Sequence, residues 1–173
     1  MSPEDGTPPD VSLVVVNFDG GQDVGACLAS LLDESAPTRE LIVVDNASRD
    51  ESPRLVEAFV AGRTGARLLR SETNLGYAGG VDLALPHCRG RYVAVLNMDL
   101  VAEPGWLAPL VDHLDRHDEV AAVNPLVTLR GGRRINAAGQ WIHVTGLGFN
   151  RDLGRPRAAA GDAPFPVAGL NGA

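Results

Sequence analysis

Short apolar runs that alternate with amphipathic segments constrain the fold of this 173-residue chain more than any other feature. Nearly unbroken apolar runs cover residues 11–16, 41–44, 92–96 and 120–123, and a weaker run covers 67–70. Such runs, without polar alternation, are typical of parallel strands buried on both faces. Between them, apolar residues recur every three or four positions, as they do along one face of a helix. The order predicts an α/β fold with a mostly parallel, doubly wound sheet.

The helical patterns and the last third of the chain complete this prediction. Helices are expected over 22–32, 52–60 and from Pro104 to Leu114, and the glycine-rich turn 74–80 opens a short helix that runs to about Leu85. In the remainder, residues 126–130 and 134–136 flank Gly131-Gly132, which predicts a hairpin. We expect a short strand over 140–145, a loop over 146–166 and the start of a last strand at 167–170.

Three portions follow from this pattern. Residues 1–10, which contain three prolines, are predicted to be a disordered lead. Residues 11–125 form the predicted α/β core, and residues 126–173 form a hairpin and loop segment.

Composition excludes several classes of protein. The net charge of −7 argues against a nucleic-acid binder. No stretch approaches the ~20 apolar residues of a membrane span, and the first ten residues lack an apolar signal core, which predicts a cytoplasmic location. Cys27 and Cys88 lie far apart, as expected for free thiols in a reducing compartment.

Polar side chains follow three of the predicted strands at the point where each strand ends. They are Asn17 with Asp19, Asp45 with Asn46, and Asn97 with Asp99. In open α/β sheets, ligands bind at the carboxyl ends of the strands. A carboxylate there can accept hydrogen bonds from a base or a ribose, or hold Mg²⁺ or Mn²⁺ against phosphates. Asp and Asn are also common turn formers, so each site alone would fit a structural role; three at consecutive strand ends favour a ligand.

Four motifs together resemble glycosyltransferase family 2. They are Val14-Val15-Val16-Asn17-Phe18-Asp19-Gly20, Val43-Val44-Asp45-Asn46-Ala47-Ser48, Asn74-Leu75-Gly76-Tyr77-Ala78-Gly79-Gly80 and Leu96-Asn97-Met98-Asp99. The rhamnosyltransferase-like bacterial branch, which builds cell-wall and surface polysaccharides, is the most similar. The resemblance implies the GT-A fold and inverting transfer of a sugar from a nucleotide diphosphate donor.

The resemblance also implies roles for individual residues. Asp45 resembles the acid that hydrogen-bonds the pyrimidine base, and Asp99 stands where the family places a ligand of Mg²⁺ or Mn²⁺. The remaining implied donor-binding residues are Asn17, Asn46, Asn74, Gly79, Gly80 and Asn97.

Two departures from the family pattern matter. Where the family commonly reads Gly-Gly-Asn-x-Gly, this chain reads Gly80-Val81-Asp82-Leu83-Ala84, and Asp82 places a negative charge beside the glycine-rich turn. The family's acidic pair near the acceptor, which includes the general base, has no counterpart in the chain. An inverting transfer needs such a base to take the proton of the acceptor hydroxyl. This implies either a fragment of a longer enzyme or a truncated product with impaired turnover.

The resemblance implies a dTDP- or UDP-linked sugar donor and a glycan or lipid-linked acceptor. Six arginines in the last third, although typical of solvated loops, leave room for peripheral contact with an anionic membrane at its cytoplasmic face. Two alternatives remain open: a nucleotide-sugar-binding module without catalysis, and a sugar nucleotidyltransferase. The latter usually carries a Gly-rich signature with Lys after the first strand, which Asn17 to Gly21 lacks.

Overall fold

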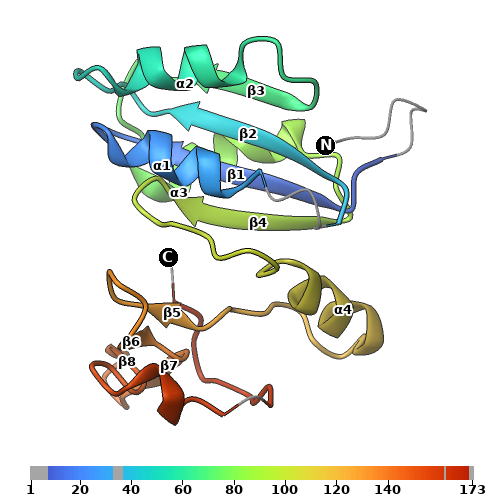
Figure 1. The fold of residues 1–173 in the computed structure, drawn as a ribbon, viewed down its shortest axis with the longest axis vertical. Coiled ribbons are helices and arrows are strands. Elements are labelled where there is room, and N and C mark those ends of the chain that lie inside the picture. Colours follow the sequence, from blue (N-terminus) through green and yellow to red (C-terminus); the bar gives the residue numbers. More distant parts are fainter. Residues whose placement is uncertain (1–7, 33–36, 162, 172–173) are drawn as a thin grey trace. The chain divides into compact units, whose positions relative to one another are not determined.

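A computed structural model describes residues 8–32, 37–161 and 163–171. The chain divides into two compact units, Met1–Val111 and Asp112–Ala173, which are described separately below (Figure 1). Most of the predicted disordered lead, residues 1–7, lies outside the described residues. No helix among the described residues is long and apolar enough to cross a membrane.

The first unit is built on a four-stranded sheet. Its strands are β1 (Val11–Asn17), β2 (Arg39–Asp45), β3 (Ala66–Arg70) and β4 (Tyr92–Asn97), in the order β3-β2-β1-β4. All three pairings are parallel. The four predicted strands up to residue 97 are therefore confirmed.

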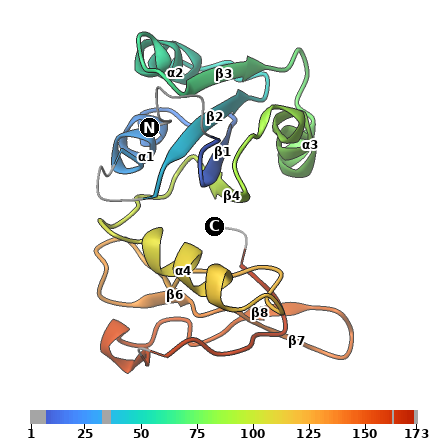
Figure 2. The same cartoon turned by 90° about the vertical axis from the view of Figure 1, so that its right-hand side faces the viewer.

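Helices cover both faces of this sheet (Figure 2). α1 (Asp23–Ser30) and α2 (Ser52–Val60) pack on one face, where Leu13, Val15 and Val43 are fully or almost fully buried. α3 (Gly76–Ala84), followed by the short 3₁₀ helix η1 (Leu85–His87), packs on the other face against Val14, among other residues. Burial on both faces explains the unbroken apolar runs of β1 and β2. The predicted doubly wound α/β fold is confirmed.

The strand β4 differs from its prediction. It is an edge strand of the described sheet, and Val93 and Val95 are 41% and 38% exposed. An apolar run shows that a strand forms, but it does not show how many neighbours the strand has. The prediction that β4 is buried is therefore wrong for the face that carries Val93 and Val95.

Residues 120–123 do not form the predicted fifth strand. The Val120 N–H donates to His117 O at 2.9 Å in a turn after α4 (Ala108–Arg116), and no described strand pairs with the segment that follows. A strand persists only where a neighbour satisfies its backbone groups. α4 also begins four residues after Pro104, so Trp106 and Leu107 precede the helix instead of lying on it.

The second unit contains two small antiparallel hairpins. β5 (Val127–Thr128) pairs with β6 (Ile135–Ala137), which confirms the hairpin predicted around Gly131-Gly132. β7 (Gln140–Ile142) pairs with β8 (Gly148–Asn150), so the predicted strand at 140–145 is present but shorter. β8 and the 3₁₀ helix η2 (Arg157–Ala159) lie in the segment predicted to be a loop. The predicted last strand is reduced to one bridge, between Gly169 and Gln140.

Candidate functional site

The carboxyl edge of the sheet brings the predicted polar residues together. Asn17 at the end of β1 is in register with Asp45 at the end of β2, which is in register with Arg70 at the end of β3. On the other side of β1, Val16 is in register with Asn97 of β4. Parallel strands present their carboxyl ends at one edge, so this clustering follows from the topology.

The side chain of Asn17 is the centre of this edge. It is fully buried, and its Nδ2 donates to Asp45 Oδ1 at 3.2 Å, Ser48 Oγ at 3.1 Å and Ser52 Oγ at 2.9 Å. Contact with a carboxylate and two hydroxyls fixes the orientation of the amide group. Its Oδ1 is then left buried without a hydrogen-bond partner. An orphaned buried acceptor carries a desolvation cost and is characteristic of a site completed by another molecule.

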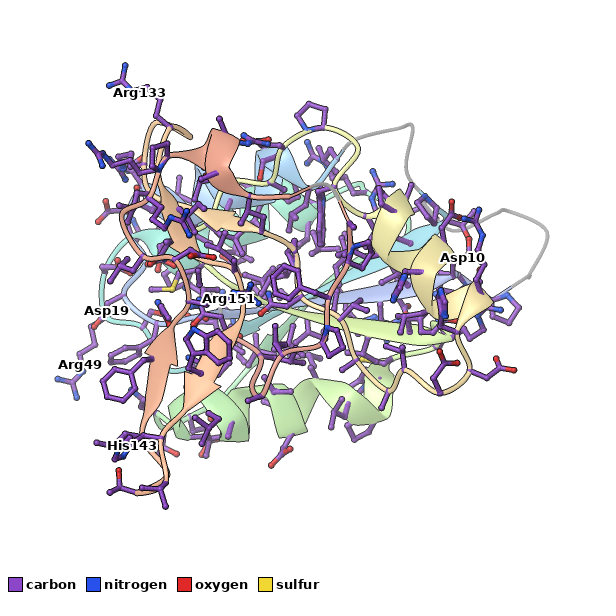
Figure 3. The ribbon with its side chains drawn as sticks, turned by 90° about the horizontal axis from the view of Figure 1, so that it is seen from below. Asp10, Asp19, Arg49, Arg133, His143 and Arg151 are labelled. Carbon is purple, nitrogen blue, oxygen red and sulfur yellow. The ribbon has the colours of Figure 1, made fainter. Side chains whose placement is uncertain are left out.

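The loops after β1 and β2 are locked to each other. Arg49 N donates to Asp19 Oδ1 at 2.7 Å, and Gly21 N donates to Asp50 Oδ2 at 2.7 Å. Asp19 and Arg49 lie at the same end of the sheet in Figure 3. Asp19 and Ala47 adopt φ values of 49° and 65°, a conformation that is uncommon for residues other than glycine. The hydrogen bonds hold two strained turns in place, and such strain clusters at functional sites.

The carboxyl group of Asp50 belongs to this lock. A hydrogen bond from the Ser52 hydroxyl at 2.5 Å, with further bonds from the backbone N–H groups of Gly21 and Ser52, holds the pKa of Asp50 below its ordinary value. Asp50 therefore stays ionised as an acceptor near neutral pH.

Asn46 connects β2 to the glycine-rich turn. Its Nδ2 donates to Asn74 Oδ1 and to Gly76 O, both at 3.0 Å, and its Oδ1 accepts from Leu75 N at 2.9 Å. The side chain is 1% exposed, so its amide is used within the protein. Asn46 thus positions the turn, while Asn74 is exposed.

Two glycines of α3 stand where a larger side chain would clash with its surroundings. A Cβ at Gly80 would lie 2.7 Å from Val16 Cγ1, and a Cβ at Gly79 would lie 2.7 Å from Leu75 Cβ. Both approaches are shorter than real Cβ contacts allow. Gly80 therefore lets α3 lie against Val16 near the end of β1, whereas Gly79 leaves room for Leu75 at the start of the helix.

The triplet Asn97-Met98-Asp99, which begins at the last residue of β4, contains one exposed carboxylate, that of Asp99. Asp99 is exposed and forms no hydrogen bond or ion pair with any described residue. Asn97 is half-buried, and its carbonyl accepts from the Cys27 thiol at 3.4 Å. Burial, with a smaller contribution from the Asp99 charge, raises the pKa of Cys27 to about 12. Burial and the same charge also raise the pKa of Tyr77.

The donor set around Asp99 suits a cation that phosphates hold in part. The described residues contain no group of three His, Cys, Asp or Glu side chains arranged to bind a metal. Mg²⁺ and Mn²⁺ sites at diphosphates commonly use one or two protein carboxylates, with phosphate and water as the other ligands. A single exposed carboxylate just after a strand fits that pattern, and Asp99 is the residue that would hold such a cation.

An open pocket of about 530 Å³ lies beside these residues, beyond the ends of β2 and β3. Ligand pockets commonly have volumes of 300–1,000 Å³. The pocket combines an aromatic ring, a carboxylate, a guanidinium and hydroxyls, and its lining includes Phe18, Asp45, Ser48, Arg70, Ser71 and Asn74. Arg70 is held by an ion pair with Glu57 Oε1 at 2.5 Å.

Sequence reasoning missed four of the residues that build this edge. Arg70 is the last residue of β3, in register with Asp45, so its place at a strand end could have identified it from the sequence. Ser48, Ser52 and Cys27 carry no such signal, because their role depends on how α1 and the loop after β2 return to the strand ends.

Comparison with known proteins agrees with this arrangement. Residues 12–164 match the family model described as glycosyl transferase family 2. The chain is 31% identical over 118 residues to the succinoglycan biosynthesis protein ExoO of Rhizobium meliloti, covering 68% of this chain and 33% of that protein. It is 24% identical over 115 residues to an uncharacterized glycosyltransferase of Haemophilus influenzae, covering 66% and 36%. The chain thus spans about a third of the length of these relatives.

Solved structures show the same fold. S. aureus TarS matches with a TM-score of 0.62 at 22% identity, over 70% of this chain and 22% of that chain. TarS 1–349 in complex with UDP-GlcNAc matches with a TM-score of 0.58, over 70% and 36%. The sheet, its helices and its carboxyl edge are those of a GT-A fold, and the chain belongs to glycosyl transferase family 2.

Proposed function

We propose that the chain is the donor-binding part of an inverting, metal-dependent glycosyltransferase that uses a nucleotide diphosphate sugar. The single observation that carries the proposal is the unsatisfied carboxyl edge, with an open pocket at one side of β1 and the free carboxylate of Asp99 at the other. The structure of TarS 1–349 with UDP-GlcNAc, which shares this fold, supports a nucleotide sugar as the donor.

The nucleoside would occupy the pocket. Asp45 would accept a hydrogen bond from the base, and Arg70 would add a cationic donor beside it. Asn17 would hold Asp45 in place through Nδ2 and offer its orphaned Oδ1 to the ligand or to an ordered water. Asn74 lines the pocket, while Asn46, Gly79 and Gly80 set the position of the glycine-rich turn.

The diphosphate would lie across the end of β1 toward β4. Adjacent strands lie about 4.8 Å apart, so β4 is roughly 10 Å from β2. A bound divalent cation would offset the charge that develops on the leaving diphosphate. Asp99 would hold that cation, and Asn97 would orient the backbone beside it.

The acceptor, the branch and the location are part of the same proposal. A rhamnosyltransferase-like enzyme of cell-wall or surface polysaccharide assembly would take a glycan or lipid-linked acceptor at the cytoplasmic face of the membrane. The succinoglycan biosynthesis protein among the relatives supports a polysaccharide acceptor. Transfer also requires a general base, and no residue of this chain matches the general base of the family. Donor binding without turnover is therefore the alternative. The family match argues against a nucleotidyltransferase.

Calorimetric titration separates the proposed parts of the site. UDP, dTDP and inorganic pyrophosphate are each titrated with Mn²⁺ into the chain and into two variants. Asp99→Asn should weaken all three ligands at least 10-fold, about 1.4 kcal/mol. Asp45→Asn should weaken only the nucleotides, because pyrophosphate has no base. Asp118→Asn removes another exposed carboxylate, outside the edge, and is the matched control.

Equal binding of nucleotide by Asp99→Asn and the parent chain would eliminate the metal assignment. Unchanged nucleotide binding by Asp45→Asn would do the same for the base pocket. Hydrolysis or transfer assays on the same samples distinguish an active enzyme from a binding module.

A further inference from the structure

A chain of hydrogen bonds connects Asp50, in the loop before α2, to Asp45 in the pocket beside the strand ends. The Ser52 hydroxyl donates to Asp50 Oδ1 at 2.5 Å, and the oxygen of that hydroxyl accepts from Asn17 Nδ2 at 2.9 Å. The same Nδ2 group donates to Asp45 Oδ1 at 3.2 Å. Asn17 and Ser52 are fully buried, and Asp45 is 6% exposed. Burial strengthens hydrogen bonds and couples neighbouring ones, so Asp50, Ser52 and Asn17 act as one unit, the relay.

The direction of these bonds follows from the chemistry of the groups. A hydroxyl carries a single proton, and Ser52 uses that proton on Asp50, so its oxygen can only accept from Asn17. Asp45 Oδ1 is a carboxylate oxygen and accepts as well. Both neighbours of Asn17 therefore require the NH₂ side of its amide group.

The orientation of Asn17 that results leaves the carbonyl side of its amide without a partner. Asn17 Oδ1 is buried and has no hydrogen-bond partner among the described residues. It lies against Gly20, where an added Cβ would overlap it and approach Met98 Cγ to 2.9 Å. In the opposite orientation, Oδ1 would face the hydroxyls of Ser48 and Ser52, which lie within 3.1 Å of the amide nitrogen. The relay thus holds the amide in the orientation that costs one hydrogen bond.

Asp50 supplies the acceptor on which this orientation depends. Besides the Ser52 hydroxyl, its carboxylate accepts from Ser52 N at 3.0 Å and from Gly21 N at 2.7 Å, so it is fixed from both loops. An Asn in place of Asp50 could donate to Ser52 Oγ through its own NH₂ group, which would release the Ser52 proton to Asn17 Oδ1. The carboxylate of Asp50 therefore favours the orientation in which the NH₂ side of Asn17 meets Asp45.

We propose that Asp50 and Ser52 are positioning residues of the nucleotide pocket, which act through Asn17 and Asp45 and do not touch the nucleotide. Asp45 lines the pocket, whereas Asp50 and Ser52 are not among its described lining residues. Because Asn17 binds Asp45 Oδ1, the carboxylate is held in one orientation, and Oδ2 is the oxygen for an N–H donor of the base. The proposal rests on the proposed function, since it takes Asp45 as the acceptor for the base, and it adds the groups that set the geometry of that acceptor.

The isosteric variant Asp50→Asn tests the relay, and Asp10→Asn is its matched control. Asp10 Oδ2 also accepts from the N–H and the hydroxyl of one residue, Thr38, at 3.0 and 2.8 Å, but it precedes β1 at the amino edge of the sheet. In calorimetric titration with Mn²⁺, Asp50→Asn should weaken UDP about 10-fold, and Asp10→Asn should leave it within about twofold of the parent. Inorganic pyrophosphate, which has no base, should bind both variants like the parent. Ser52→Ala, which removes the middle of the relay, should weaken UDP to a similar extent as Asp50→Asn.

Proton NMR reports the orientation of the Asn17 amide directly, which a general loss of structure would not reverse. In the parent, the nuclear Overhauser effect from the side-chain NH₂ protons should be stronger to the β-protons of Ser52 than to the α-protons of Gly20. In Asp50→Asn this ratio should reverse, because the NH₂ group moves to where Oδ1 lies in the parent. Asp10→Asn should keep the parent pattern.

A double-mutant cycle separates the relay from the base pocket. Asp45→Asn removes the group on which the relay acts, so adding Asp50→Asn to it should weaken UDP by no more than about twofold further. Losses that multiply in the double variant, an equal loss in Asp10→Asn, or an unreversed Overhauser pattern in Asp50→Asn would each overturn the proposal. If Asp45→Asn weakened UDP and Asp50→Asn did not, the relay alone would be wrong. Unchanged UDP binding by Asp45→Asn would instead overturn the base pocket itself.

Discussion

The two edges of the parallel sheet carry polar clusters of opposite character. At the amino edge, Glu40 is 1% exposed and accepts from Ser12 Oγ at 2.7 Å, Arg89 N at 2.6 Å and Arg89 Nε at 3.0 Å. Its carboxylate also lies 3.8 Å from Arg67 Nη2. At the carboxyl edge, Asn17 Oδ1 has no hydrogen-bond partner among the described residues, and Asp99 forms no hydrogen bond or ion pair with any of them. Figure 3 shows Asp10 and Asp19, which flank β1, at these two opposite ends.

The difference shows what each cluster does. A buried polar group whose hydrogen bonds are all made within the protein stabilises one conformation. A buried acceptor that the protein leaves unsatisfied lowers stability and is kept where a ligand or water completes it. The amino edge is therefore a structural clamp, and we propose that the carboxyl edge is the one that binds the donor.

Removing Glu40 should lower the free energy of unfolding more than any other substitution proposed here. Glu40→Ala leaves the Ser12 hydroxyl and the Arg89 N–H without their acceptor, and should lower the free energy of unfolding by about 3 kcal/mol. Nucleotide affinity of the folded variant should stay within twofold of the parent. Asp45→Ala should cost only about 1 kcal/mol of stability and abolish nucleotide binding. Urea denaturation and calorimetric titration measure both quantities, and equal stability losses would remove the distinction between the edges.

Two closely packed glycines, one at each edge, form a matched pair for the next test. A Cβ at Gly90 would lie 2.7 Å from Val11 C, so Gly90→Ala should destabilise the fold by about 2 kcal/mol. A Cβ at Gly20 would overlap Asn17 Oδ1 and approach Met98 Cγ to 2.9 Å. Gly20→Ala should therefore weaken nucleotide binding about 10-fold, roughly 1.4 kcal/mol.

The outcome of this pair is informative in either direction. If Gly20→Ala left nucleotide affinity intact while lowering stability as much as Gly90→Ala, the carboxyl edge would be a clamp like the amino edge. Thermal denaturation with and without UDP and Mn²⁺ resolves the two cases, because ligand stabilisation depends on affinity.

The sequence predicted the carboxyl edge far better than the amino edge. Asn17, Asp45 and Asp99 each stand where an apolar run stops, and parallel topology then places them on one side of the sheet. Glu40 and Arg89 are 49 positions apart, and neither ends a strand. Their pairing depends on the strand order β3-β2-β1-β4, which no local pattern determines.

The errors in the predicted fold have a related cause. The run at 92–96 forms β4, but its exposed edge depends on which strands lie beside it. The run at 120–123 has the same local character and forms no strand, because no described neighbour completes its ladder. β8, in contrast, forms within a segment rich in glycine and arginine because β7 pairs with it. Local pattern indicates capacity for a strand, and tertiary pairing decides the outcome.

The pH dependence of the free energy of unfolding is a third test of whether the amino edge, around Glu40, acts as a structural clamp. Burial alone would raise the pKa of Glu40, but hydrogen bonds from Ser12 and Arg89 and the charge of Arg89 outweigh it and lower the pKa below its ordinary value of 4.5. A depressed folded-state pKa adds stability that is fully present above pH 4.5 and is lost as pH falls below that value. We therefore expect the free energy of unfolding to fall less for Glu40→Gln than for the parent as the pH is lowered from 5 to 3. If urea denaturation showed the free energies of unfolding of Glu40→Gln and of the parent falling in parallel with pH, the amino edge would not be a clamp.

The reactivity of the two cysteines reports separately on the opening of the two edges. It is the smallest effect that we expect. Cys27 is fully buried near Asn97 and Asp99, whereas Cys88 is half-buried beside Ser12 and Glu40. Burial raises the pKa of both thiols, to about 12 for Cys27, so Cys88 should react slowly with a disulfide reagent at pH 8 and Cys27 only on unfolding. Opening of the amino edge in Glu40→Ala should accelerate Cys88 about 10-fold without exposing Cys27. Gly20→Ala should do the reverse. Mass spectrometry of the labelled peptides assigns each rate, and joint acceleration of both thiols in either variant would mean that the two edges open as one unit.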